Sequence, residues 1–240
     1  MNSNSHYAQL CTPVSVRHAT KRTAPRKKCM ATALQWGMAY RHTEKTLARK
    51  AEIRQRILHA ALALVNSGGF GALTMVAVAA DADIATGGVY KHFESKAELC
   101  AEVFRLATEK EVAVVRENAL HPGSPSQRLL HVVEAFAMRA LRNPRLAFAL
   151  IAEPVDALVD VQRLRYRQAY ADMFVQLVEQ GIASGEFAPQ TASVSAAALV
   201  GVIAESLIGP LSWSVLDKPH MDEHALIGAI QAFCLRAVAV

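Results

Sequence analysis

The chain has 240 residues, half of them apolar and only 6% aromatic, so it is long enough to bury a sizeable core and its composition favours helix over sheet. The positive charge is concentrated at one end, because residues 1–50 contain ten Lys and Arg residues and one acid, whereas residues 51–240 contain 16 basic and 20 acidic residues. A basic arm on a mildly acidic body suggests a polyanionic partner such as nucleic acid, although a solvated tail without a partner has the same composition.

Residues 1–48 show no sustained hydrophobic period, and we expect them to be a disordered basic extension. No long apolar segment follows the first charges, so the sequence predicts no secretory signal. The four cysteines form neither a close pair nor a metal-ligand spacing, which is typical of reduced thiols. We therefore expect a cytoplasmic protein without a disulfide framework.

A helical pattern begins near Lys50. Apolar residues then recur at spacings of three and four from Ile53 to Leu64, which predicts one buried helix face. The sequence Asn-Ser-Gly-Gly at 66–69 predicts the end of this first helix.

Two short helices follow. Thr74 is the expected N-cap of the first, 81–84 is turn-like, and the second is predicted over 85–92, which together make a helix-turn-helix. In this motif the second helix enters the major groove of DNA. Gly87 and Gly88 lie in that helix although each costs about 1 kcal/mol there relative to alanine. We expect them to let the backbone approach DNA closely.

Ser95 and Glu98 have the capping-box spacing and predict a long fourth helix to about Asn118. The segment 121–126 holds two prolines and a glycine and is the clearest break in the chain. Five further helical patterns come after it, at 126–142, 144–152, 156–183, 191–209 and 222–239. The sequence therefore predicts an all-α fold, with an N-terminal three-helix helix-turn-helix DNA-binding domain and a larger C-terminal helical domain.

The stretch from Lys50 to Leu99 resembles the DNA-binding module of the tetracycline-repressor (TetR) family. The resemblance is carried by residues in register, namely Phe70, Gly71, Leu73, Thr74, the expected core positions Val76 and Ala79, Gly87, the run Tyr90-Lys91-His92-Phe93, Ser95, Lys96 and Leu99. Ala85 and Gly88 depart from the family pattern, in which a serine and a polar residue are frequent. Direct readout of bases is therefore expected to depend on fewer side chains.

The resemblance implies three parts: the extension 1–48, a DNA-binding domain over 49–99, and a ligand-binding and dimerisation domain over 100–240. The DNA-binding residues that it implies are Arg49, Lys50, Thr74, Thr86, Gly87, Gly88, Tyr90, Lys91, His92 and Lys96. Among them, Thr74 and Lys96 would contact phosphate, Thr86, Gly87 and Lys91 would face the groove, and Tyr90 and His92 would touch the sugar-phosphate backbone. Packing is an alternative role for Tyr90, and helix capping for His92.

The C-terminal helices offer a dimer interface and a candidate pocket. Residues 191–209 are rich in Ala and Gly, which allow close helix packing, and 222–239 has an apolar face that would join them in a homodimer; an internal core helix of a monomer is the alternative. Residues expected to line a pocket for a small-molecule effector are Phe136, Phe148, Glu153, Tyr166, Tyr170, Phe174 and Trp213. Plain core packing explains such aromatic residues equally well.

Two other classes of protein compete with a ligand-responsive dimeric repressor on a palindromic DNA operator. One is a soluble helical enzyme, but the sequence contains no catalytic motif and predicts no cofactor. His220 and His224 have a spacing that suits a metal, yet their position in an expected loop favours a solvated pair, so we predict no metal site. The other is a membrane-attached interaction protein, because residues 192–216 are long and apolar. Glu205 and Pro210 within that stretch argue against membrane insertion.

Overall fold

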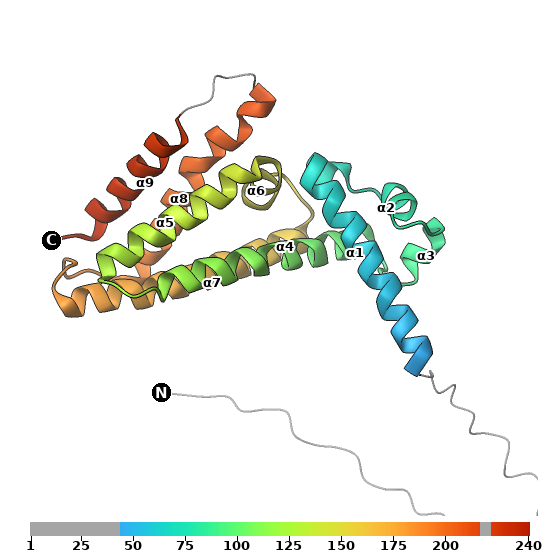
Figure 1. The fold of residues 1–240 in the computed structure, drawn as a ribbon, viewed down its shortest axis with the longest axis horizontal. Helices are drawn as coiled ribbons and strands as arrows, with labels where there is room; N and C mark the ends of the chain where they lie inside the picture. Colours follow the sequence, from blue (N-terminus) through green and yellow to red (C-terminus); the bar gives the residue numbers. More distant parts are fainter. Residues whose placement is uncertain (1–43, 217–221) are drawn as a thin grey trace, which may run out of the picture. The chain divides into compact units, whose positions relative to one another are not determined.

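The computed structural model describes residues 44–216 and 222–240, so the expected extension up to residue 43 lies outside the described residues. Within these ranges the chain forms nine α-helices and no strand, which confirms the all-α prediction (Figure 1). The helices are α1 Glu44–Ala72, α2 Met75–Asp81, α3 Thr86–Tyr90, α4 Lys96–Ala119, α5 Pro125–Arg142, α6 Pro144–Ile151, α7 Ala157–Ser184, α8 Ala192–Leu216 and α9 Glu223–Val238.

Helix α1 begins at Glu44, so residues 44–48, which we expected to be disordered, are helical. Its last turn is separated from the rest by Gly69, whose φ of 72° and ψ of −175° interrupt the helix within the predicted glycine-rich end. A positive φ is easily adopted only by glycine, so this residue type fixes the position of the kink.

Helices α1, α2 and α3 enclose a small core with the start of α4. Ile57, Leu73, Val78 and Phe93 are buried completely in it. Val76, which we expected in the core, is 68% exposed instead. The seven-residue helix α2 buries only one face, and that face carries Met75, Val78 and Ala79.

Helix α4 joins this small core to a second, larger one. Leu99 and Phe104 near its start are buried in the first core, and Val115 near its end is buried in the second. Its N-terminus is capped by Ser95 Oγ, which accepts a hydrogen bond from the Glu98 amide at 3.1 Å. The Glu98 carboxylate accepts from the Glu94 amide at 2.6 Å, so the second bond of the expected box reaches one residue further back.

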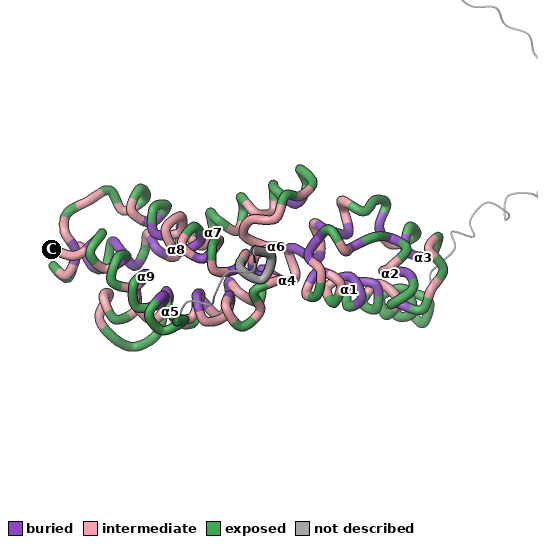
Figure 2. Tube along the Cα trace, turned by 90° about the horizontal axis from the view of Figure 1, so that it is seen from above, coloured by how far each residue is buried: buried purple, intermediate pink, exposed green. Residues whose placement is uncertain are grey.

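Helices α5 to α9 form the larger core. Four of them begin at polar side chains that accept a backbone N–H group: Ser124, Asn143, Asp156 and Asp222. Helix α7 lies between α4 and α8, and α5 packs against α9. Along α9, buried residues alternate with exposed ones (Figure 2), which leaves an exposed face on that helix.

Helix α8 continues through Pro210 to Leu216, whereas we expected it to end at residue 209. A proline removes one backbone donor, here the partner of the Ser206 carbonyl, but Leu207 and Leu211 on either side of it are buried. Core packing therefore outweighs the lost hydrogen bond. The window Ala192–Ser212 is long and apolar enough to cross a membrane, and a third of it is buried inside the fold. Core helices of soluble proteins, which are mostly buried, pass the same test of length and composition.

Both cysteines in the described ranges, Cys100 and Cys234, are buried free thiols, each in one of the two cores. Burial raises the pKa of each thiol to about 11.

Candidate functional site

The turn between α2 and α3 is fixed by hydrogen bonds from both sides. Thr74 Oγ1 accepts from the Ala77 amide at 3.1 Å and starts α2. Arg56 on α1 donates to the carbonyls of Ala82 and Asp83, where α2 ends. Asp83 has a φ of 51°, a conformation that Asp tolerates better than most residues. The α3 helix is thus held at a defined angle to α2.

The two glycines of α3 are not required by steric contacts with the described residues. A Cβ atom at Gly87 would meet no atom within 4 Å, and one at Gly88 would make only ordinary contacts of 3.6 Å and more with Ile84. Neither glycine has a positive φ. Their cost to the helix is therefore not explained by packing or backbone conformation inside the protein.

Most side chains predicted to bind DNA are free for an external partner. Tyr90 is 51% exposed, and Arg49, Lys50, Lys91 and Lys96 are exposed as well. Neither an ion pair nor a hydrogen bond engages these four cations within the described part of the chain. Lys96 is the first residue of α4, and Thr86 is the first residue of α3.

His92 lies at the point where α1 approaches the end of α3. Its Nδ1 atom is buried without a hydrogen-bond partner. Burial, together with the charges of Lys50 and Arg54, lowers its pKa from the ordinary value of 6.5. The Arg54 guanidinium lies 4.5 Å from the centre of the Phe93 ring and pairs with Glu102 at 3.3 Å. Because the charge of Lys50 acts on the His92 ring, these two predicted DNA-binding residues lie near each other.

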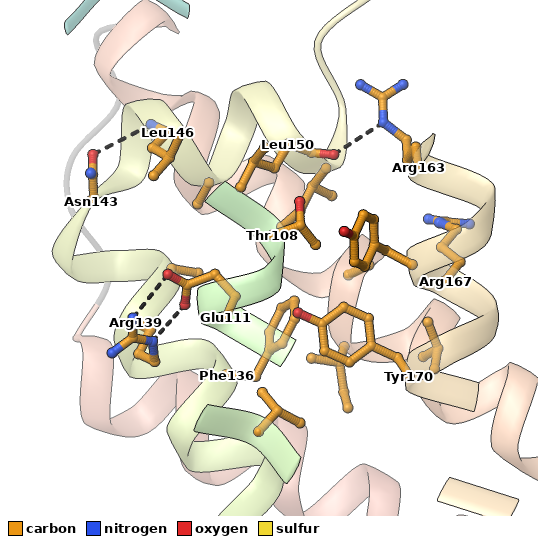
Figure 3. A pocket seen from close by; sticks show the side chains of 18 of the residues that line it. Thr108, Glu111, Phe136, Arg139, Asn143, Leu146, Leu150, Arg163, Arg167 and Tyr170 are labelled. Carbon is orange, nitrogen blue, oxygen red and sulfur yellow. Dashed lines mark hydrogen bonds and ion pairs between the residues drawn. The ribbon is translucent and has the colours of Figure 1, made fainter. Parts of the chain in front are cut away.

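A cavity of about 290 Å³ lies in the larger half of the protein, between α4, α5, α6, α7 and α8 (Figure 3). Four of the predicted pocket residues line it: Phe136, Tyr166, Tyr170 and Phe174. Phe136 and Tyr170 meet edge to face, with ring centres 5.6 Å apart. Leu146 and Leu150 of α6 and Ile203 of α8 close other sides with apolar surface.

Charged groups lie at two sides of the cavity (Figure 3). On one side, Arg139 forms two hydrogen bonds with the Glu111 carboxylate, at 2.5 and 2.9 Å. On the other side are Arg163 and Arg167. Arg163 is occupied by backbone carbonyls and Asp160. Arg167 is exposed and has no such partner in the described ranges, so its charge is available at the cavity mouth.

Two hydroxyl groups in the cavity wall also lack partners. Thr108 is only 5% exposed, and its buried Oγ1 makes no hydrogen bond. Tyr170 forms none with the described residues, and burial followed by the charge of Glu111 raises the pKa of its phenol. A buried unpaired hydroxyl is costly, so Thr108 favours a ligand that offers polar atoms, and the Tyr170 hydroxyl is also available to such a ligand.

Two of the remaining predicted pocket residues, Phe148 and Glu153, are not found in the cavity wall. Phe148 packs against the larger core outside the cavity. Glu153 is a correction: it follows the end of α6, and its carboxylate binds the last turn of α1 instead. Pro154 favours an extended backbone at Glu153 and so directs the chain away from α6. The side chain of Trp213 lies outside the described residues.

Comparison with known families identifies the two halves. A model of the tetR family of bacterial regulatory proteins matches residues 57–103, and a model of the tetracyclin repressor-like C-terminal domain matches residues 122–207. The chain belongs to the tetR family. The first match covers the helix-turn-helix, and the second covers α5 to α7 and much of α8.

Among curated relatives of this tetR-family protein are two repressors named KstR. The protein of Mycolicibacterium smegmatis is 39% identical over 99 residues, which are 41% of this chain and 48% of that one. The protein of Mycobacterium tuberculosis is 35% identical over 99 residues, 41% of this chain and 45% of that one. The chain thus spans about half the length of the curated relatives it matches.

Solved structures of tetR-family proteins share the fold over most of the chain. FadR from Bacillus subtilis, solved in complex with stearoyl-CoA, has a TM-score of 0.65 at 17% identity, over 76% of this chain and 98% of that one. A tetR-family regulator from Shewanella sp. PV-4 has a TM-score of 0.59 at 23% identity, over 78% of this chain and 98% of that one. At these identities the likeness shows the fold alone.

Several residues of the candidate sites in this tetR-family protein could not have been identified from the sequence. Glu111 and Arg139 are 28 residues apart, and only the packing of α4 against α5 brings them together. Thr108 and Arg56 also belong to no motif. Arg167 could have been identified as a cavity residue, because it lies four residues from Arg163 on α7 and residues four apart share one face of a helix. No group of three His, Cys, Asp or Glu in the described ranges could hold a metal ion, and His220 lies outside them.

We expect His92 to make the stability of the folded protein pH-dependent. Its pKa is lowered in the folded state, so the unfolded chain binds more protons below pH 6.5 and the free energy of unfolding falls as the pH decreases from there. Urea unfolding at pH 7.5 and 5.5 should show a smaller decrease for His92→Gln than for the wild type. His59→Gln, at an exposed position on α1, is the control. An equal decrease in all three proteins would contradict this role of His92.

Proposed function

We propose that the protein is a dimeric DNA-binding transcriptional repressor that leaves a palindromic operator when a small-molecule effector binds. The observation that carries this proposal is the exposed α3 helix, whose glycines are not required by the packing of the described residues. The KstR relatives are named repressors, which supports repression over activation. Family membership favours a regulator over the soluble enzyme that the sequence left open.

The DNA contacts of this proposal come from residues 49–99. Gly87 and Gly88 would allow α3 to sit deep in the major groove, with Thr86 and Lys91 beside base edges. Cations at the ends of α1 and α4, Lys50 and Lys96, would bind phosphates on either side. Because few side chains reach the bases, DNA shape would contribute to operator choice.

The dimer would form through α8 and α9, at residues 191–209 and 222–239. Small and apolar residues remain exposed on both helices: Val194, Ala197, Ala198 and Gly209 on α8, and Ala225, Gly228, Ala229, Ala232 and Phe233 on α9. Phe233 is 53% and Val194 66% exposed. A partner covering this face would also explain why α8 is so apolar, and we therefore propose a cytoplasmic protein without a membrane anchor.

The effector would be an amphipathic anion with a long apolar part. The apolar cavity would hold its chain, the Thr108 and Tyr170 hydroxyls would bind polar atoms within it, and Arg167 at the mouth would bind a negative group. An acyl-CoA has this chemistry, and FadR from Bacillus subtilis binds stearoyl-CoA. We propose that the effector of this protein belongs to the same chemical class.

The DNA proposal is tested on an operator selected from a random DNA pool. Gly87→Leu should weaken operator binding more than tenfold without loss of folding stability, because a side chain there meets only DNA. Lys96→Ala should reduce the slope of log affinity against log salt by about one. Ala113→Leu, an exposed position on α4, should bind as the wild type does. Wild-type affinity of Gly87→Leu would contradict the role of the glycines.

The dimer proposal is tested by sedimentation at micromolar concentration. Gly201→Leu should shift the protein towards monomer and weaken operator binding, because a bulky side chain would separate two α8 helices. Within one subunit a Cβ at Gly201 meets no atom within 4 Å, so folding should be retained. A monomeric wild-type protein would refute the proposed interface.

The effector proposal is tested by calorimetric titration with stearoyl-CoA. The wild type should bind it and release the operator, and Arg167→Ala should bind about tenfold more weakly, which corresponds to about 1.4 kcal/mol. Arg165→Ala removes an exposed arginine of the same helix that does not line the cavity, and it should bind normally. Absence of binding to the wild type would rule out this effector class.

A further inference from the structure

Residues 145–156, which are most of α6 and the loop that leads to α7, form the α6–α7 corner. This corner contacts both the cavity and the core of the helix-turn-helix. Leu146 and Leu150 line the cavity. Ala149, one residue away, is completely buried in the core of the helix-turn-helix, together with Val159 from the start of α7. A change in the shape of the cavity at α6 therefore acts on residues that also support the DNA-binding helices.

Glu153 connects this corner to α1 directly. One carboxylate oxygen accepts the Phe70 amide at 2.9 Å, and the other accepts the Gly71 amide at 3.0 Å. Both amides belong to the last turn of α1, immediately after the kink at Gly69. A Cβ atom at Gly69 would lie 2.4 Å from Glu153 Oε2, so only glycine at this position leaves room for the carboxylate.

Two arginines strengthen the same connection. Arg145 on α6 donates to the Gly68 carbonyl at 2.8 Å, which gives α1 a second attachment to the corner. Arg163, which lines the cavity, donates to the carbonyls of Glu153 at 2.8 Å and Leu150 at 3.0 Å. The backbone that carries Glu153 is thus held by a side chain of the cavity wall (Figure 3 shows the bond to Leu150).

We propose that Glu153 is a positioning residue that transmits the state of the cavity to the DNA-binding helices. A ligand that displaces α6 or Arg163 moves the Glu153 backbone, and the two charge-assisted hydrogen bonds carry this movement to α1. This inference concerns the regulation of the site described above and rests on the proposed ligand-responsive repressor. A purely structural Glu153 would stabilise α1 equally whether the cavity is empty or filled.

The test measures how much a side chain that fills the cavity weakens operator binding, in the wild type and in variants that lack the Glu153 connection. Ala204→Phe fills the cavity from α8, far along the chain from the corner. We expect it to weaken binding to the selected operator at least tenfold in the wild type, but less than twofold in Glu153→Gln and in Gly69→Ala, which break the connection from its two sides. Glu179→Gln, an exposed carboxylate on α7, should retain the full effect. Stearoyl-CoA serves as a second perturbation in the same four backgrounds.

Each outcome separates the two proposals. Equal effects of cavity filling in all backgrounds mean that Glu153 is only structural, which overturns this inference while the ligand-responsive repressor stands. No effect of either perturbation in any background overturns both. Thermal unfolding confirms that each variant is folded, and Arg145→Gln, which removes the second attachment alone, replaces any variant that is not. It should reduce the effect of cavity filling only in part.

Discussion

The small core of the helix-turn-helix is not closed by its own helices, and this constraint shapes the rest of the protein. Ala149 of the α6–α7 corner and Val159 at the start of α7 are both fully buried in this core and close it. Helices α2 and α3 are only seven and five residues long and bury little surface by themselves, so side chains from the neighbouring domain add contacts to this core. Because the same corner lines the cavity, the cavity wall is in contact with the residues that pack under α1.

The packing of the α6–α7 corner determines which arginines of the cavity wall remain free to bind a ligand. Arg163 is used almost entirely to hold backbone carbonyls of the corner, and its burial lowers the pKa of its guanidinium. Arg139 is neutralised by Glu111. Arg142 and Arg167 also line the cavity, are exposed and form no ion pair among the described residues, so these two charges remain available to an anion. Selectivity would then depend on how far these charges lie from the Thr108 hydroxyl.

Much of the fold could be predicted from sequence because its determinants are local. Periodic apolar residues and caps such as Thr74, Ser95 and Asp156 mark helices wherever they occur. The prediction was wrong at Pro210, where burial of distant residues overrides a local breaker, and at Val76, where a short helix has a narrower buried face than expected. Both errors arise from tertiary packing, which the local pattern does not contain.

The cavity could be predicted from the sequence only in part: four of its aromatic residues were predicted, whereas Thr108, Glu111 and Arg139 were not. The residues of α3 and its flanks share a register over less than thirty positions, whereas the cavity collects side chains from five helices. Glu153 shows the limit clearly. A carboxylate near aromatic residues suggested a ligand contact, but its partners are amides 82 and 83 residues away that no spacing rule connects to it.

The two buried cysteines have a consequence for how the protein meets oxidants. With a pKa near 11, the thiols of Cys100 and Cys234 stay protonated at neutral pH, and the protonated form is a poor nucleophile towards peroxides and disulfides. Each is also shielded by a packed core. Oxidative stress therefore leaves these two sulfur atoms unmodified as long as the helices around them remain closed.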